Sequence, residues 1–460
     1  MSDDNKTRML LEDAAQRGIA YRESCGKRSV APSVDAFTDV SRFIEPMPES
    51  GTADEDVLAL LDQIGSPASM AMAGPRFFGF VIGGSLPVTV ATNWLTTAWD
   101  QNSVMREVTP ATATLEQVAL DWMVDLFGLP AQTGGGFVTG ATVANFTALA
   151  AARHRVFEDA GWNVEADGLI GAPDVTLIVS AEAHPTLFKS LGMLGLGRDR
   201  VIRVPTDSQG RMIAAELPAI KGPTIVCTQA GNINTGAFDP ISEICAAVKP
   251  HGAWVHVDGA FGLWAAVSDK HRWLIDGMEQ ADSWATDAHK WLNVPYDSGI
   301  AFVRSAADLA AAMAITAEYL ITDTEYRNPS DYTPELSRRA RGVDVWAALR
   351  SLGRSGAGRL VDDCCRHARR FAQGFADAGF EILNDVVLNQ VLVSFGDDVT
   401  TRAVIDAIQR DGTCWCGATV WRGRTAMRIS VSSWATTEED VEKSLLAMIS
   451  IGQRPGNPPP

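Results

Sequence analysis

Short, continuous apolar segments alternate with stretches of helical spacing between residues 56 and 305, and this alternation limits the fold more than any other feature. The clearest apolar segments are Val175–Ser180, Thr224–Thr228, Trp254–Val257 and Gly299–Val303. Strands that are apolar throughout and separated by helices are typical of a parallel sheet with helices on both faces. We therefore expect an α/β fold that binds its ligand at the carboxyl edge of the sheet.

The rest of the chain divides around this central region. Residues 1–55 predict an N-terminal helical arm, and residues 56–340 predict a large domain. Residues 341–450 mix helices with strands and predict a smaller α+β domain. The Pro-rich residues 451–460 predict a disordered tail.

Composition and charge exclude several classes of partner. The chain has 39 basic and 56 acidic residues and a formal net charge of −17, so we expect neither nucleic acid nor a membrane as partner. No apolar run approaches the roughly 20 residues that span a bilayer, and residues 1–20 contain no apolar signal core. The seven cysteines are an odd number without the spacing of a zinc site. We expect a cytoplasmic protein that holds no metal.

Lys290 has surroundings that are unusual for a lysine. It follows Asp287-Ala288-His289 and lies among apolar residues that include Trp284 and Trp291. An ammonium group is costly to bury there, and desolvation favours the neutral amine that forms imines. Most lysines are solvated surface charges, so Lys290 alone leaves both interpretations open.

Three further motifs place polar groups where strands end or helices begin. The segment His256–Gly259 closes a strand with the carboxylate of Asp258, which could pair with a protonated pyridine nitrogen or form an ordinary Asx-turn. A Gly-rich segment, Gly134–Gly140, leads through Thr142 into a helix and predicts either a phosphate site or a simple linker. His184 follows another strand and could stack on a flat ring or form a structural hydrogen bond.

The order of these motifs resembles that of fold-type I enzymes of pyridoxal phosphate (PLP): a phosphate loop, a stacking histidine, a strand-end aspartate and then His-Lys. The chain resembles the group II PLP-dependent amino-acid decarboxylases from about residue 60 to residue 445. This resemblance implies a mostly parallel seven-stranded sheet between helices in the large domain. Further segments that carry the resemblance are Pro75–Phe80, Pro110–Glu116, Gly236–Pro240, Arg428–Val431 and Thr436–Asp440.

The resemblance implies a cofactor role for each matching residue. Lys290 would hold PLP as a Schiff base, and Asp258 would keep the pyridine nitrogen protonated. His184 would stack on the ring opposite Ala260, and His289 would help to hold the phosphate. The other implied cofactor contacts are Gly140, Ala141, Thr142 and Asn232, the last standing where many relatives have threonine.

The resemblance also implies residues on the substrate side. Arg428 matches a position that can bind a substrate carboxylate, although a structural ion pair is an alternative. Gly74 stands where relatives often carry histidine, and the loss of this imidazole makes the assignment of an aromatic amino acid as substrate less secure. In this family a tyrosine on a mobile loop supports protonation at Cα. Of Tyr319, Tyr326 and Tyr332 we choose Tyr332 as the catalytic residue, on a loop that closes over a neighbouring subunit's site.

The sequence therefore predicts a homodimeric PLP-dependent carboxy-lyase that converts an L-amino acid into the amine and CO2. An aminotransferase, an aldehyde synthase or another carbon–carbon lyase would use the same cofactor and remains an alternative. A non-catalytic PLP-fold scaffold is a further alternative, against which the retention of Lys290 argues. Neither the amino acid nor the regulation of the protein follows from the sequence.

Overall fold

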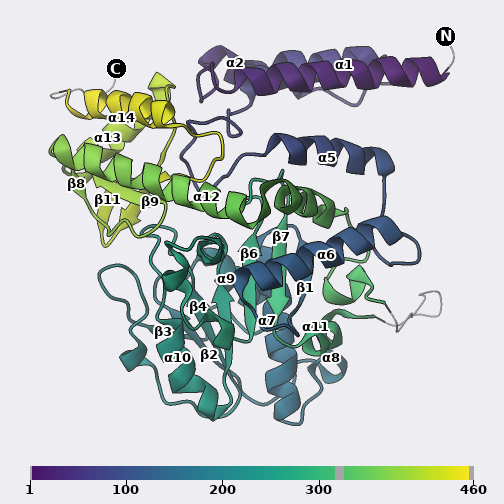
Figure 1. Cartoon of the computed structure of the whole chain (residues 1–460), viewed down its shortest axis with the longest axis vertical. Helices are drawn as coiled ribbons and strands as arrows, with labels where there is room; N and C mark the ends of the chain where they lie inside the picture. Colours follow the sequence, from purple (N-terminus) through teal and green to yellow (C-terminus); the bar gives the residue numbers. More distant parts are fainter. Residues whose placement is uncertain (1–2, 316–325, 455–460) are drawn as a thin grey trace. The chain divides into compact units, whose positions relative to one another are not determined.

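The computed structural model describes residues 3–315 and 326–454 (Figure 1). The chain forms two compact units. The first unit comprises Met1–Ile82, Arg370–Leu383 and Leu392–Pro460, and the second comprises Gly83–Arg369 and Asn384–Val391.

The second unit contains the predicted α/β sheet, which has seven strands in the order β1-β7-β6-β5-β4-β2-β3. The pairs from β3 through β2, β4 and β5 to β6 are parallel, and β7 is antiparallel to both of its neighbours. The strands are β1 (Gly134–Val138), β2 (Thr176–Ser180), β3 (Val201–Val204), β4 (Thr224–Gln229), β5 (Trp254–Asp258), β6 (Ser283–Asp287) and β7 (Gly299–Val303).

The four strands predicted from sequence are present, and only the direction of Gly299–Val303 differs from the expected parallel arrangement. The segment between β6 and β7, residues 288–298, is too short for the helical crossover that a parallel connection requires. The strand therefore returns antiparallel to β6. The expectation of a mostly parallel sheet is confirmed.

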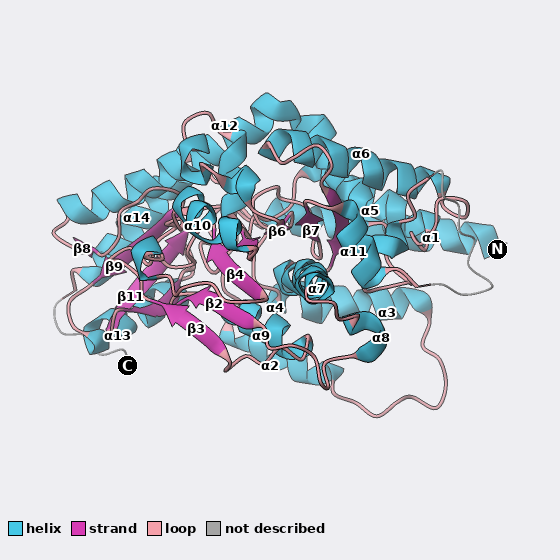
Figure 2. Cartoon of the chain, turned by 90° about the horizontal axis from the view of Figure 1, so that it is seen from below, coloured by secondary structure: helices cyan, strands magenta, loops and turns pink. Residues whose placement is uncertain are grey.

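Helices cover both faces of this sheet, with α7 and α9 on one side and α10 on the other (Figure 2). α7 packs across β4, β5, β6 and β7, and its buried side is rich in alanine, which permits a close approach. The α-helices that lie wholly in the second unit are α5 (Pro87–Trp99), α6 (Pro110–Phe127), α7 (Ala141–Asp159), α8 (Val164–Asp167), α9 (Pro185–Met193), α10 (Ile241–Val248) and α11 (Ala306–Met313).

Six short 3-10 helices are also present among the described residues of the second unit. α12 (Arg341–Asp377) begins in this unit and is interrupted at Gly353, whose φ of 61° is not helical. The 3-10 helices are η3 (Ala214–Glu216), η4 (Lys249–His251), η5 (Gly262–Val267), η6 (Arg272–Ile275), η7 (Met278–Gln280) and η8 (Pro329–Tyr332).

The first unit combines the N-terminal helices with most of a four-stranded sheet of order β10-β11-β9-β8. α14 runs through Ile451 and Gly452, two residues into the predicted tail, because Ile451 is buried. No described helix is long and apolar enough to cross a membrane. The remaining elements are α1 (Asp3–Ser24), α2 (Val34–Asp39), η1 (Val40–Phe43), α3 (Asp54–Leu60), η2 (Leu61–Gly65), α4 (Ser66–Ala68), β8 (Glu381–Ile382), β9 (Gln390–Ser394), α13 (Asp398–Asp411), β10 (Gly417–Trp421), β11 (Arg424–Ser430) and α14 (Glu438–Gly452).

Candidate active site

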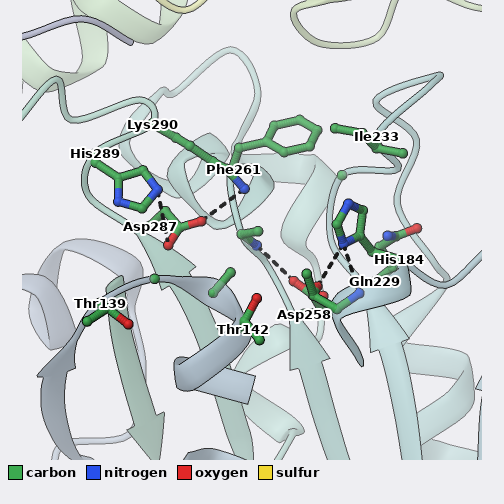
Figure 3. Close-up of a pocket in the computed structure, with 15 residues that line it drawn as sticks. Thr139, Thr142, His184, Gln229, Ile233, Asp258, Phe261, Asp287, His289 and Lys290 are labelled. Atoms are coloured by element: carbon green, nitrogen blue, oxygen red, sulfur yellow. Dashed lines mark hydrogen bonds and ion pairs between the residues drawn. The ribbon is translucent and has the colours of Figure 1, made fainter. Parts of the chain in front are cut away.

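A pocket of about 310 Å³ lies at the carboxyl edge of the larger sheet, wholly within the second unit (Figure 3). Its walls come from the segments that follow β1, β2, β4, β5 and β6, which reach the same edge because β2, β4, β5 and β6 are parallel. Among the residues predicted from sequence, those that line the pocket are Gly140, Ala141, Thr142, His184, Asp258, Ala260, His289 and Lys290.

The amine of Lys290 faces a carboxylate that the sequence analysis did not single out. Lys290 Nζ lies 2.9 Å from Oδ2 of Asp287, whose side chain is buried at the end of β6. The other carboxylate oxygen, Oδ1, is buried and has no hydrogen-bond partner among the described residues. The sequence signal that could have identified Asp287 was a carboxylate at a strand end, three residues before the lysine. Asp287 thus places a carboxylate beside the Lys290 amine inside the pocket.

Asp258 ends β5 as a buried carboxylate that no described lysine or arginine neutralises. Its Oδ1 accepts the Ala260 N–H at 3.2 Å, and its Oδ2 accepts Nδ2 of Asn145 at 3.0 Å. A buried carboxylate is costly unless a positive group joins it. The pocket therefore suits a ligand with a protonated ring nitrogen.

His184 lies across the pocket as the N-cap of α9. Its Nδ1 accepts the Thr186 N–H at 3.3 Å and lies 2.7 Å from Oγ1 of the same residue. These two contacts restrict the imidazole, which points into the pocket on the side of Asp258 (Figure 3). A ring held in this way can stack against a flat ligand.

The opposite end of the pocket provides donors for an anion. Thr139, Gly140, Ala141 and Thr142 line it where α7 begins, and a helix N-terminus directs backbone N–H groups toward bound phosphate. An added Cβ on Gly140 would lie 3.3 Å from the His289 ring, so a larger residue would reduce this space.

His289 adds a further donor at the same end. Burial lowers the pKa of His289, and its Nδ1 accepts the Ser298 N–H at 3.0 Å. A neutral imidazole that accepts at Nδ1 carries its proton on Nε2. Nε2 lies 3.7 Å from Oδ1 of Asp287 (Figure 3), and because His289 lines the pocket, Nε2 can also donate to an anion that binds there.

Asn232 does not line the pocket. Its Oδ1 accepts the N–H groups of Asn234 and Thr235, and its Nδ2 donates to Oε1 of Gln229 at 3.2 Å. Gln229 does line the pocket, so Asn232 is connected to the pocket through its hydrogen bond to Gln229. The pocket residues that the sequence analysis missed are Thr139, Thr186, Gln229, Gly231, Ile233, Phe261 and Asp287.

The two predicted substrate-side residues belong to the first unit. Arg428, on β11, is largely buried, and burial lowers its pKa to about 10. No hydrogen bond or ion pair joins its guanidinium to another described residue, so the structural ion pair considered as an alternative is not found there. At Gly74 an added Cβ would lie 2.8 Å from the Cys25 carbonyl oxygen, so a histidine there would require the backbone to shift.

The three candidate tyrosines have different settings. Tyr332 packs its ring partly buried against the core of the second unit, under the Arg327 guanidinium at 4.4 Å, and does not line the pocket. Tyr326 is exposed, with the Arg106 guanidinium 4.1 Å from its ring centre. Tyr319 lies outside the described residues.

Residues 47–396 match the family model of the pyridoxal-dependent decarboxylase conserved domain. The chain therefore belongs to the pyridoxal-dependent decarboxylase family, whose cofactor is PLP. It is 31% identical over 323 residues to an acidic amino acid decarboxylase of Bos taurus, with 67% of this chain and 61% of the bovine protein covered. It is 29% identical over 441 residues to the L-2,4-diaminobutyrate decarboxylase of Rhizobium meliloti, with 88% and 83% covered. The chain thus spans about three fifths of the bovine relative.

Solved structures show the same fold at low sequence identity. A structure of Oryza sativa TDC with PLP and tryptamine has a TM-score of 0.90 at 22% identity and covers 98% of both chains. Mouse CSAD also has a TM-score of 0.90, at 23% identity, and covers 98% of this chain and 100% of that one. These likenesses confirm the fold predicted from sequence.

The pocket residues fit PLP by their own chemistry. Asp258 lacks a cationic partner among the described side chains and suits a protonated ring nitrogen. The start of α7 and Nε2 of His289 suit a phosphate, and Lys290 provides an amine between them (Figure 3). The pocket could hold the cofactor with its phosphate toward Thr142 and its ring toward Asp258.

Proposed function

We propose that the protein decarboxylates an L-amino acid to the amine and CO2, with Lys290 as the residue that binds PLP covalently. One observation carries this proposal: the Lys290 amine and the Asp258 carboxylate face one pocket from the ends of the adjacent parallel strands β6 and β5. When bound, PLP supplies an aldehyde that condenses with amines and a ring that accepts the electron pair left by departing CO2.

The side chains of the pocket divide the remaining work among them. Asp287, 2.9 Å from Lys290 Nζ, can accept the proton that the ammonium must release before its amine attacks a carbonyl. Asp258 would pair with a protonated ring nitrogen of PLP, which would make the ring a stronger electron acceptor. His184 would cover one face of that ring.

Covalent attachment at Lys290 can be tested by spectroscopy and mass spectrometry. We expect the wild-type protein mixed with PLP to show a visible absorbance band. After borohydride reduction, the peptide that contains Lys290 should gain the mass of PLP less one oxygen atom, because the condensation releases water and the reduction adds two hydrogens. Lys290→Ala should lose both signals, whereas Lys221→Ala, at an exposed lysine, should keep them. A wild-type protein that binds no PLP would refute the proposal.

The reaction itself is tested by its products. Purified protein loaded with PLP would be incubated with each amino acid, first with acidic amino acids and L-2,4-diaminobutyrate because two relatives are named for them. A primary amine and CO2 in equal amounts are expected. A carbonyl product would instead indicate transamination or aldehyde formation.

We further propose that one tyrosine of residues 319–332 supports protonation at Cα. Tyr332 is the first choice from sequence, but its ring packs against the core, so Tyr319 and Tyr326 must be compared with it. Phenylalanine variants of all three would be assayed for the ratio of carbonyl to amine product. The responsible tyrosine should raise that ratio when replaced, and three unchanged ratios would contradict the assignment.

We also propose a homodimer with shared active sites, located in the cytoplasm. Residues 34–47 expose six large apolar side chains, an arrangement typical of a protein interface: Val34, Phe37, Val40, Phe43, Ile44 and Met47. None of the seven cysteines forms a disulfide and all are buried, which is compatible with a reducing compartment.

A further inference from the structure

Behind Asp258, a chain of buried polar side chains runs away from the pocket. Trp254, His256 and Asp258 alternate along β5 and therefore face the same side of the sheet. The register of β5 with β6 sets Ser283 opposite His256. α7 packs over these strands and brings Asn145 between His256 and Asp258. All five side chains are buried.

Four hydrogen bonds join these five side chains into one series. Trp254 Nε1 lies 2.9 Å from Ser283 Oγ, which lies 2.9 Å from His256 Nδ1. His256 Nε2 lies 2.9 Å from Asn145 Oδ1, and Asn145 Nδ2 lies 3.0 Å from Asp258 Oδ2.

The chemistry of the two ends determines the direction of every bond. A carboxylate only accepts, so Asn145 must present its NH₂ group to Asp258 and its oxygen to His256. His256 must then carry a proton on Nε2 to donate to that oxygen. Burial lowers the pKa of His256 to about 3, so the ring is neutral and its Nδ1 accepts from the Ser283 hydroxyl. Ser283 in turn accepts from the Trp254 indole N–H, which can only donate.

The series gives Asp258 one fixed orientation. Oδ2 is held by Asn145 and Oδ1 by the Ala260 N–H, and each oxygen keeps a free lone pair. Because His256 is neutral, the series adds no positive charge behind Asp258 that would weaken its attraction for a protonated ring. A polar series of this kind is not needed for core stability, since apolar packing would serve there equally well.

We propose that Asn145 and His256 are positioning residues that hold Asp258 against the ring nitrogen of the cofactor through a one-directional hydrogen-bond relay from Trp254. The relay rests on the proposed function, in which Asp258 meets that nitrogen. Neither residue lines the pocket, so each acts only through Asp258.

The direction of the relay is tested without cofactor or substrate. In ¹⁵N-histidine NMR spectra of the cofactor-free protein, the His256 signal should report the neutral Nε2–H tautomer and stay unchanged from about pH 5 to pH 9, well above its lowered pKa. The signal is assigned by its loss in His256→Gln. An Nδ1–H tautomer, or titration within that range, would overturn the relay.

The effect of the relay on cofactor binding is tested with Asn145→Asp. This variant replaces the NH₂ group that donates to Asp258 by an oxygen that can only accept, at nearly unchanged side-chain volume. We expect PLP affinity and kcat to fall about tenfold or more, with KM nearly unchanged, because Asp258 loses its donor. His256→Gln, which can still donate to Asn145, should retain more of both than His256→Phe. A wild-type-like absorbance spectrum, PLP affinity and kcat in Asn145→Asp would overturn the proposal.

Thr147→Val is the matched control, because Thr147 is buried on the same helix and its hydroxyl has no partner among the described residues. It should leave PLP affinity within about twofold of wild type. Thermal unfolding of each cofactor-free variant shows whether that variant folds. If Asn145→Asp does not fold, Ser283→Ala tests the relay at its step between Trp254 and His256. A wild-type protein that binds no PLP refutes the proposed function. If the wild-type protein binds PLP and Asn145→Asp changes neither PLP affinity nor kcat, only the relay is refuted.

Discussion

At the scale of single residues, the order of motifs along the chain predicted much of the pocket. Lys290, His289, Asp258 and His184 line it together although up to 106 positions separate them, from 184 to 290. Asp287 was missed because its role depends on where the Lys290 side chain points, which no spacing determines. Asn232 does not line the pocket, because its side-chain oxygen accepts hydrogen bonds within its own turn.

Arg428 offers a prediction about substrate affinity. Its guanidinium is largely buried and has no partner among the described side chains, so a substrate carboxylate would provide the missing charge. We expect Arg428→Gln to raise KM about tenfold or more and to change kcat less, because a hydrogen bond to a charged group is worth about 1.5–3 kcal/mol. Steady-state kinetics on the identified substrate would measure both constants.

Arg424 provides the control for that experiment, since it lies on the same strand and forms an exposed pair with Glu381. Arg424→Gln should leave KM within about twofold, because exposed ion pairs contribute little. Equal KM values for Arg428→Gln and the wild-type protein would exclude a role for Arg428 in binding the substrate carboxylate.

At the scale of elements, the pocket depends on the close approach of backbone segments. Gly299 begins β7 directly against the loop that enters α7, and an added Cβ would lie 2.4 Å from Cα of Gly140. Gly83 is similarly close to the backbone of Lys290, because its added Cβ would lie 1.7 Å from the Lys290 carbonyl oxygen. The Gly-rich composition of the loop that enters α7 was visible in the sequence, but the identity of the segment packed against it was not.

Gly299→Ala should therefore damage both stability and cofactor binding. Overpacking at this contact is expected to lower the free energy of unfolding by about 1–3 kcal/mol and to weaken PLP binding by displacing Gly140. Denaturant unfolding of the cofactor-free protein and PLP titration would measure the two effects.

Gly192 gives the opposite case, because it lies in α9 with open space around its Cα. Gly192→Ala should raise the free energy of unfolding by about 0.5–1 kcal/mol and leave PLP binding unchanged. If the two alanine variants behaved alike, close backbone contact at Gly299 would not be the cause.

At the scale of the whole molecule, stability should depend on pH through the buried histidines. The folded protein holds the pKa of His256 at about 3, and burial also lowers the pKa values of His271 and His289. In the unfolded chain a histidine has a pKa of about 6.5, so between these values the unfolded state binds more protons. These histidines therefore lower the free energy of unfolding as the pH decreases from about 6.5 toward about 3. Asp239, whose pKa burial raises to about 7, contributes in the opposite direction over part of the same range.

Replacing His256 isolates one part of this dependence. His256→Gln should reduce the slope of unfolding free energy against pH by up to about 1.4 kcal/mol per pH unit in that window, the value for one proton. Urea unfolding of the cofactor-free proteins at several pH values would give both slopes. Identical slopes would show that His256 is protonated in the folded state.

The proposed dimer gives a further prediction at this scale. Sedimentation of the wild-type protein should give twice the chain mass of 49.3 kDa. Phe37→Asp, within the exposed apolar residues 34–47, should weaken the dimer about tenfold or more, because a charge would lie in the interface. Val399→Asp, at an exposed residue of α13, should leave the mass unchanged. A monomeric wild-type protein would refute the dimer.

The sequence by itself determined the α/β class, four strands of the larger sheet and several residues that line the pocket, because apolar runs and strand-end polar groups are local patterns. Tertiary structure alone decided that β7 returns antiparallel, that Asp287 meets Lys290, and that Asn145 meets His256 and Asp258. These contacts join residues of different elements, and their directions depend on how helices and strands pack. Local patterns cannot encode them, since one residue spacing is compatible with many packings.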